Sequence, residues 1–225
     1  MERSLVLGSL EASARDVLFR KAARKVFEKD TLIFAYGEPG NSMMLIDTGR
    51  VEISVTTEQG RKCVLGHMGP GELVGELAML DGGTRSADVT AVVITTGLLV
   101  TFNDFRSFLK TNPEIMLSLL QGLTAKIRNA NALVEDRAQK DASARLARCV
   151  LRLAQKWGKP TDGGGIYIRQ TFSQSDIGEL ASLARENVNR RFRSWMEEEI
   201  LHFDDAGRMI LPDPAALEKI ASRGS

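Results

Sequence analysis

The stretch SQSDIGELASLARENVNRRFRSWM, residues 173–196, decides the fold of the C-terminal part of the chain. Ser173, with Asp176 three residues later, matches a capping box, a side-chain pattern that starts a helix. The first helix carries apolar residues on one face: Ile177, Leu180 and Ala181. After a break at Ser182–Leu183 a second helix is expected over about 185–198, and its apolar face is formed by Val188, Phe192, Trp195 and Met196. The stretch therefore predicts two short helices joined by a tight turn.

Positive charge gathers at the beginning of the second helix. Residues 185–193 contain four arginines and one acid, whereas residues 196–205 are acidic, and the whole chain has a net charge of +1. In a helix-turn-helix the second helix presents its N-terminal residues to base edges in the major groove, where arginine suits guanine. A hairpin-like wing is expected at 201–211. Together these features predict DNA binding rather than the alternative, a solvated charged face on a surface helix.

Residues 31–102 have the pattern of a β-rich domain. Short apolar runs alternate there with glycine-containing turns, at 37–40, 47–50, 58–60 and 69–71. Short strands with turns at near-regular spacing are typical of a sandwich or barrel rather than of βαβ units. The segment Val51–Val55 alternates apolar and polar residues, which predicts a half-buried strand.

Helical patterns follow this domain. Asn103 is expected to cap a first helix, and Asn112–Pro113 to open a much longer helix with proline at its first position. In the long helix apolar residues recur at spacings of three and four: Met116, Leu120, Leu123, Ile127, Ala130 and Val134. This spacing is that of a coiled-coil seam. It favours a dimer over the alternative, an amphipathic helix packed on its own barrel.

The apolar pattern is interrupted at Gln139–Ala142, which predicts a hinge. A further helix is expected over 143–157. It ends at a glycine-rich loop over 158–165, and a strand is expected at 166–168.

The most informative stretch of the barrel is GELVGELAMLDGGTRSA, residues 71–87. A short helix that begins at Gly75 offers free backbone N–H groups to an anion. Arg85 supplies charge-assisted donors for the exocyclic oxygens of a cyclic phosphate, and Ser86 adds a hydroxyl. Glu76 would accept from a ribose 2′-hydroxyl, which only a ribonucleotide carries. The alternative is a plain barrel turn with a surface arginine.

The run of residues 177–190 resembles the helix-turn-helix of the cyclic-AMP receptor protein and FNR superfamily, in which Arg-Glu-x-x-x-Arg reads a TGTGA-like half-site. The resemblance implies Arg185 and Arg190 on guanines and Glu186 on a cytosine edge. It also implies further DNA contacts, with Gln174 and Ser175 on phosphates, and with Asn189. Family members usually have serine as the cap before the Arg-Glu pair. Here Ala184 stands in that place, so the cap is missing or is supplied by Ser182, at a cost of about 1 kcal/mol.

Residues 71–87 likewise resemble the phosphate-binding cassette of cyclic-nucleotide domains. This resemblance implies six ligand residues: Gly75, Glu76, Leu77, Ala78, Arg85 and Ser86. On the long helix it places base recognition at Ala130 and Asn131, of which only Asn131 can donate and accept hydrogen bonds. Lys126 or Arg128 can pair with Glu76 and couple the barrel to the helix, since the spacing permits either.

The effector implied by the resemblance is cyclic AMP first, cyclic GMP next and a cyclic dinucleotide such as cyclic di-GMP third. A regulator that uses its barrel without any nucleotide is the remaining alternative. Family members that do not bind nucleotide typically lack the cassette arginine, and this chain keeps Arg85.

The resemblance spans roughly residues 5–213 and implies an α+β fold. The predicted parts are a cyclic-nucleotide-binding β-roll, a jelly-roll barrel, over 1–112, a dimerisation helix with its hinge over 113–141, and a winged helix-turn-helix over 142–225. A homodimeric transcription regulator is expected, with double-stranded DNA and RNA polymerase as partners. A cytoplasmic location is expected because no signal peptide or membrane span is found in the sequence.

Other classes of protein fit the composition poorly. Cys63 and Cys149 are too few for a disulfide framework, a zinc site or an iron–sulfur cluster. The histidines are His67 and His202, and His202 lies in the expected wing, so haem sensing is not expected. No nucleophile, base or metal constellation is found in the sequence, so neither catalysis nor a bound metal is expected.

Overall fold

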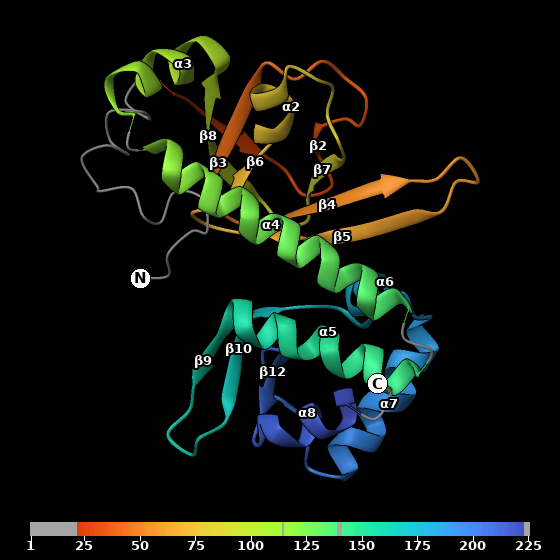
Figure 1. Ribbon diagram of the computed structural model, residues 1–225. Helices are drawn as coiled ribbons and strands as arrows, with labels where there is room; N and C mark the ends of the chain where they lie inside the picture. The colour runs from red at the N-terminus through yellow and green to blue at the C-terminus, as the bar shows by residue number, and fades with distance from the viewer. Residues whose placement is uncertain (1–21, 114, 139–140, 223–225) are drawn as a thin grey trace. The chain divides into compact units, whose positions relative to one another are not determined.

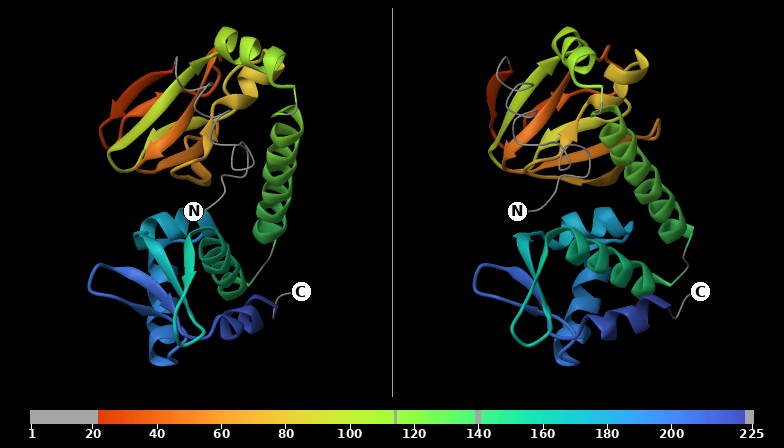
Figure 2. Two further views of the ribbon diagram at one scale, coloured as in Figure 1. Left: turned by 90° about the vertical axis from the view of Figure 1, so that its left-hand side faces the viewer. Right: turned by 60° about the vertical axis from the view of Figure 1, so that its left-hand side comes forward.

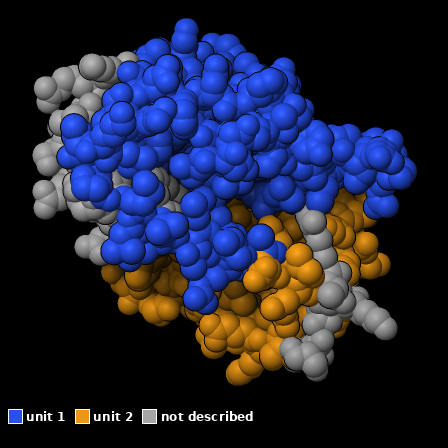
Figure 3. Space-filling view, turned by 45° about the horizontal axis from the view of Figure 1, so that its top comes forward, with its two compact units in different colours: residues 1–130 blue, residues 131–225 orange. Residues whose placement is uncertain are grey.

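The computed structural model describes residues 22–113, 115–138 and 141–222. The chain divides into two compact units, residues 1–130 and 131–225, which Figure 3 shows in different colours. Within the described ranges no helix is both long and apolar enough to cross a membrane.

The first unit is built on two antiparallel four-stranded sheets, with the strand orders β1-β8-β3-β6 and β2-β7-β4-β5 (Figure 1). The strands are β1 Ala23–Phe27, β2 Leu32–Phe34, β3 Ser42–Thr48, β4 Val51–Thr56, β5 Lys62–Met68, β6 Leu73–Val74, β7 Asp88–Ala91 and β8 Thr95–Thr101. A tight turn between β4 and β5 closes where the sequence predicts it, with the N–H of Gly60 donating to Thr57 O at 2.8 Å. The predicted β-rich domain of short strands is confirmed.

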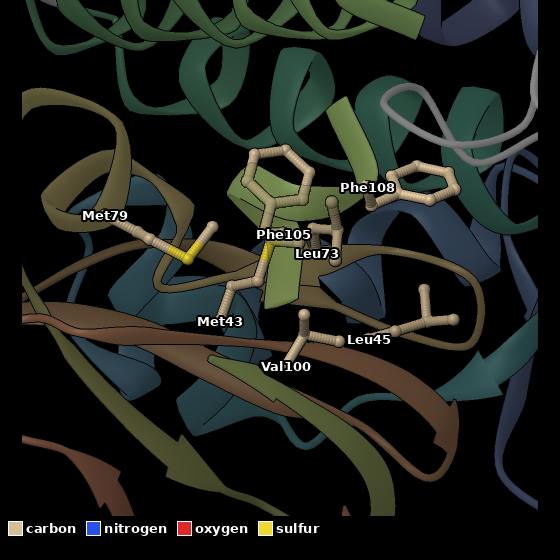
Figure 4. Close-up of a cluster of buried hydrophobic side chains, with 7 residues drawn as sticks. All are labelled: Met43, Leu45, Leu73, Met79, Val100, Phe105 and Phe108. Carbon is tan, nitrogen blue, oxygen red and sulfur yellow. The ribbon is translucent and has the colours of Figure 1, made fainter. Parts of the chain in front are cut away.

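Strand β3 is buried on both faces, which explains its uninterrupted apolar run. Side chains alternate across a strand, so Met43 and Leu45 point to one face and Met44 and Ile46 to the other. The first pair belongs to a buried cluster with side chains from β6, β8 and the helices α2 (Glu76–Asp81) and α3 (Phe102–Thr111): Leu73, Met79, Val100, Phe105 and Phe108 (Figure 4). The second pair packs with side chains from the other sheet: Phe34, Val51 and Val89.

The half-buried alternation predicted for β4 is wrong. Glu52 and Ser54, the polar members of the pattern, are buried, whereas Ile53 and Val55 remain partly exposed. Strand β4 lies between β7 and β5 within its sheet. The carboxylate of Glu52 is compensated by Lys62 Nζ at 2.6 Å, so burial does not leave this charge unpaired.

Two predicted helix starts are corrected by the structure. Helix α3 is capped by Thr101 instead of Asn103, because the Thr101 hydroxyl oxygen accepts from the N–H of Asp104 at 3.3 Å. Asn112 ends α3, with its N–H donating to Phe108 O at 3.0 Å, and it does not open the next helix. The long helix α4 runs over Ile115–Ala138, so Pro113 precedes it.

The second unit combines a small sheet with helices. Its elements are α5 Ala142–Trp157, β9 Gly158–Pro160, β10 Ile166–Thr171, α6 Gln174–Ala181, α7 Arg185–Glu197, β11 His202–Phe203, β12 Arg208–Leu211 and α8 Pro214–Ser222. The sheet has the order β11-β12-β10-β9, and α5 packs against β10 and α8 (Figure 2). The predicted wing is confirmed as the hairpin β11–β12. Neither β9 nor α8 was expected from the sequence.

The last turn of α4 is joined to α5 by a buried ion cluster. Asp136 is 8% exposed, and its carboxylate pairs with Arg148 at 3.6 Å and also with Arg152. Burial lowers the pKa of the Arg152 guanidinium. Of the predicted hinge, residues 139–140 lie outside the described ranges, and Asp141 caps α5 by accepting from the N–H of Ser143 at 2.6 Å.

Replacing Asp136 tests whether this cluster stabilises the second unit. Asp136→Ala leaves two partly buried arginines without their carboxylate, and we expect the free energy of unfolding to fall by about 1–2 kcal/mol, since about a quarter of each arginine side chain stays in water. The measurement is urea unfolding followed by circular dichroism. The control is Glu135→Ala at the exposed neighbouring position, which should change stability by less than about 0.5 kcal/mol. Equal effects of the two variants would contradict a role of the cluster in stability.

Candidate functional site

The predicted cassette contains a short helix that begins directly after a glycine with a left-handed backbone. Helix α2 begins directly after Gly75, whose φ of 79° lies in the left-handed region that favours glycine. A Cβ at this position would lie 2.7 Å from both Arg85 Nη1 and Phe34 Cε2. Glycine is therefore required at residue 75 for both its backbone conformation and the space around it.

Arg85 is held inside the first unit by oxygen atoms of β3 and the cassette. Its side chain donates from Nη1 to Gly75 O at 2.7 Å and to Ser42 O at 2.8 Å, and from Nη2 to Ser42 Oγ at 3.2 Å. The residue is 5% exposed, and burial lowers the pKa of its guanidinium, while the carboxylates of Glu38 and Glu76 act in the opposite direction. Arginine keeps its charge in proteins, so the cassette contains a fixed cation.

Glu76 is the second charged group of the cassette and is 2% exposed. Lys126 of α4 donates to Glu76 Oε1 at 2.5 Å and to Leu73 O at 3.2 Å. Of the two cations that the spacing allowed, Lys126 therefore makes the pair, and Arg128 is exposed. The carboxylate expected to meet a ribose hydroxyl is thus also the anchor of the long helix.

The remaining predicted ligand residues differ in exposure. Leu77 and Ser86 are exposed, whereas Ala78 is 2% exposed. The side chain of Ala78 is a methyl group, so only its backbone can donate a hydrogen bond. Asn131 is exposed on α4 and belongs to the second unit, so its contact with a nucleotide stays a prediction.

The helix-turn-helix is confirmed in the second unit. Ser173 and Asp176 form the capping box of α6, and Ser182 ends this helix in the left-handed conformation with a φ of 53°. A Cβ at Gly178 would lie 2.7 Å from Leu183 O, so the close turn requires glycine there. Helix α7 starts after Ala184 without a side-chain cap, so the cap is missing and Ser182 does not replace it.

Helix α7 separates an apolar face from a polar one. Val188, Phe192 and Trp195 are buried as predicted, but Met196 is 37% exposed, because it follows Trp195 onto the solvent side of the helix. The polar face lines a hollow of about 510 Å³ with Arg185, Glu186, Asn189, Arg190, Arg193, Ser194 and Glu197. The prediction missed Arg193, Ser194 and Glu197, although they continue the same face at spacings of three and four residues.

Two amide side chains hold the predicted DNA-reading residues in place. Asn187 Oδ1 accepts from Arg190 Nη2 at 2.7 Å. Asn189 Nδ2 donates to Gln174 Oε1 at 2.9 Å, which ties α7 to the start of α6. The amide NH₂ of Gln174 and the exposed hydroxyl of Ser175 remain suitable donors for a phosphate.

The wing carries its own charged contact. Arg208 donates from Nε to Asp204 Oδ2 at 2.9 Å across the hairpin turn, and its guanidinium lies 4.9 Å from the ring centroid of Tyr167. The pKa of Asp204 is lowered, chiefly because the backbone N–H of Arg208 donates to its carboxylate.

Within the described ranges, no group of three histidine, cysteine, aspartate or glutamate side chains is arranged to hold a metal ion.

Family models match both parts of the chain. A cyclic nucleotide-binding domain matches residues 24–112, and a Crp-like helix-turn-helix domain matches residues 144–220. Among curated proteins, a CRP-like cAMP-activated global transcriptional regulator from Mycobacterium tuberculosis is 29% identical over 204 residues, which are 88% of this chain and 91% of that protein. A cyclic AMP receptor protein from Thermus thermophilus is 27% identical and covers 98% of each chain.

Solved structures show the same fold at lower identity. FixK2 from Bradyrhizobium japonicum has a TM-score of 0.79 at 20% identity and covers 91% of this chain and 99% of its own. The c-di-GMP responsive global regulator CLP from Xanthomonas campestris has a TM-score of 0.72 at 19% identity, with 89% and 99% covered.

The crowding around Gly75 gives a test with a matched control. Gly82, at the other end of α2, also has a left-handed φ, of 72°, but a Cβ there would meet nothing within 4 Å. Gly82→Ala should therefore lower the free energy of unfolding by about 1 kcal/mol through backbone strain alone. Gly75→Ala should cost about 3 kcal/mol, because the methyl group also displaces Arg85 and Phe34. Urea unfolding compares the two variants, and equal losses would argue against the crowding.

Proposed function

Because the chain belongs to the CRP/FNR superfamily and is a CRP-like, cyclic-nucleotide-responsive, DNA-binding transcription regulator, we propose that it acts as a homodimer that binds a TGTGA-like palindrome under the control of cyclic AMP. The observation that carries the proposal is the buried cation of the cassette. Arg85 lies beside Gly75 at the start of α2, where the donors for a cyclic phosphate come together.

The pair of Glu76 and Lys126 supports a route from nucleotide to helix. A ribose 2′-hydroxyl that donates to Glu76 shares this carboxylate with Lys126, whose Nζ lies 2.5 Å from it. Nucleotide binding then changes the anchor of α4, and with it the balance between two arrangements of the dimer. Such a shift requires the nucleotide to bind the two arrangements with different affinity.

Cyclic AMP is the preferred effector. The relatives from Mycobacterium tuberculosis and Thermus thermophilus are described as cAMP-activated and as a cyclic AMP receptor, and each matches at least 88% of this chain. Cyclic GMP is the second choice, because the amide of Asn131 can serve either purine. A cyclic dinucleotide is the third candidate effector, because CLP, which shares the fold, is a c-di-GMP responsive protein. A barrel that acts without any nucleotide is the remaining alternative.

The exposed side of α4 supports the homodimer. Large apolar side chains remain in water there: Met116 at 45%, Leu117 at 64%, Leu120 at 54%, Ile127 at 62% and Val134 at 69% exposed. An apolar stripe of this length on a helix is typical of an interaction surface. A second copy of α4 can cover this stripe, because its residues recur at coiled-coil spacing. The exposed stripe therefore favours a dimer seam over packing of α4 against the barrel.

The polar face of α7 supports direct reading of DNA bases. We assign Arg185 and Arg190 to guanines and Glu186 to a cytosine amino group, with Asn189 beside them. In a dimer the two recognition helices enter successive major grooves about 34 Å apart. Arg193 adds a phosphate contact on the same face. RNA polymerase as a partner, and the cytoplasm as the place of action, rest on the family alone.

Calorimetry tests the sensor. Wild-type protein is titrated with cyclic AMP, cyclic GMP and cyclic di-GMP, and saturable binding of one of them, cyclic AMP in our expectation, identifies the effector. Arg85→Ala should weaken that binding by about 100-fold, because a buried charge-assisted contact is lost. The control Arg106→Ala removes an exposed arginine of α3 and should bind normally. If none of the nucleotides binds the wild type, the sensor assignment is wrong and the DNA assignment stands by itself.

Binding to operator variants tests base reading. Fluorescence anisotropy with a TGTGA palindrome, and with each base pair changed in turn, should show that Arg190→Ala loses about 10–100-fold in affinity and no longer discriminates at one guanine. Arg193→Ala should instead weaken binding to all sites alike and reduce its salt dependence. A uniform loss with Arg190→Ala would contradict its assignment to a base.

A charged substitution on α4 tests the proposed dimer. Ile127→Glu places a charge in the exposed apolar stripe of α4 and should give monomers in sedimentation velocity, with weaker binding to the two-half-site palindrome. A dimer that persists in this variant would place the subunit interface elsewhere.

A further inference from the structure

The guanidinium of Arg85 lies over the face of an aromatic ring. Its Cζ is 3.8 Å from the ring centroid of Phe34, a residue of β2 that lies 51 positions earlier in the chain. Both residues are buried, with Phe34 9% exposed and Arg85 5% exposed. The ring is itself fixed, because Phe34 belongs to the buried cluster between the two sheets.

The ring supplies a contact that hydrogen bonds do not provide. Acceptors bind a guanidinium in its plane, and the oxygen atoms of Gly75 and Ser42 do so through Nη1 and Nη2. The flat faces of the cation carry no N–H group, and an aromatic face with its negative quadrupole compensates one of them. The buried cation is therefore compensated by hydrogen-bond acceptors along its edge and by the aromatic ring on one of its faces.

The bonds to Gly75 and Ser42 use three of the five N–H groups of the guanidinium. The ring over the cation and the oxygen atoms around it together hold the guanidinium in one orientation, so the direction of its other donors is set as well. The space for this stack depends on Gly75, since a Cβ there would meet both Arg85 and Phe34 at 2.7 Å.

We infer that Phe34 is a positioning residue for anion binding: its ring holds the Arg85 guanidinium in the orientation in which the remaining N–H groups meet the phosphate of the ligand. Phe34 itself touches no ligand in this arrangement. The inference rests on the proposed function for the identity of that anion, a cyclic nucleotide phosphate. The geometry of the stack is independent of it.

The test changes the electrostatics of the ring while its shape is kept. Phe34 is replaced by 3,4,5-trifluorophenylalanine, which fills nearly the same volume with a much weaker quadrupole, and in a separate variant by leucine. Cyclic AMP affinity, measured by calorimetry, should fall by about threefold to fivefold with the fluorinated ring and by about tenfold with Phe34→Leu. Phe34→Tyr keeps an electron-rich ring and should bind within about twofold of the wild type.

A control separates positioning from loss of packing. Val51→Ala removes buried volume from the same cluster and leaves the ring under Arg85, so it should lower thermal stability without a matching loss of cyclic AMP affinity. Equal losses of affinity in Val51→Ala and Phe34→Leu would overturn the inference. So would an affinity that does not respond to fluorination.

A second readout needs no nucleotide. In nitrogen-15 spectra the side-chain N–H signals of Arg85, assigned by their loss in Arg85→Lys, should be shifted upfield by the ring and protected from solvent exchange. Both features should disappear in Phe34→Leu and persist in Phe34→Tyr. Unchanged Arg85 signals in Phe34→Leu would show that the ring does not hold the cation. If the wild type binds no cyclic nucleotide, the proposed function fails, and these spectra still decide whether Phe34 positions Arg85.

Discussion

A guanidinium that is taken out of water needs its hydration replaced by fixed groups, and the first unit is arranged around this requirement at Arg85. Phe34 comes from one sheet of the barrel, whereas Ser42 and Gly75 come from the other sheet and its connection to α2. The cation is therefore compensated only when the two sheets have come together. The cassette therefore depends on the packing of the two sheets against each other.

The same cassette meets the long helix through a second buried charge. Lys126 compensates the negative charge of Glu76, so the face of α4 that carries Lys126 packs against the barrel. Gly122, one turn earlier, is buried on that face, while Leu120 and Ile127 remain exposed on another. The 3.6-residue period of the helix thus separates the residue that pairs with the cassette from the exposed apolar residues assigned to a second copy in the proposed function.

In the second unit, short-range contacts prepare the reading surface. The capping box of α6 and the left-handed Ser182 set the turn, and α7 then needs no cap of its own because its apolar face is held by the core. Asn187 restrains Arg190 in the free protein, and under the proposed function this lowers the entropy that DNA binding must overcome. The ion cluster at Asp136 joins the end of α4 to this preorganised domain.

The sequence by itself determined most features that depend on neighbours within one or two turns, although it placed the cap of α3 at Asn103 instead of Thr101. The capping box at Ser173, the periodic apolar faces, the wing and the segment around Arg85 all lie within such short spans, where local geometry decides the outcome. Only the tertiary structure decided which cation pairs with Glu76, what lies beneath Arg85, and that Asp136 is buried with two arginines. These contacts join residues from 12 to 51 positions apart, and their partners are selected by the packing of sheets and helices, which no local pattern records.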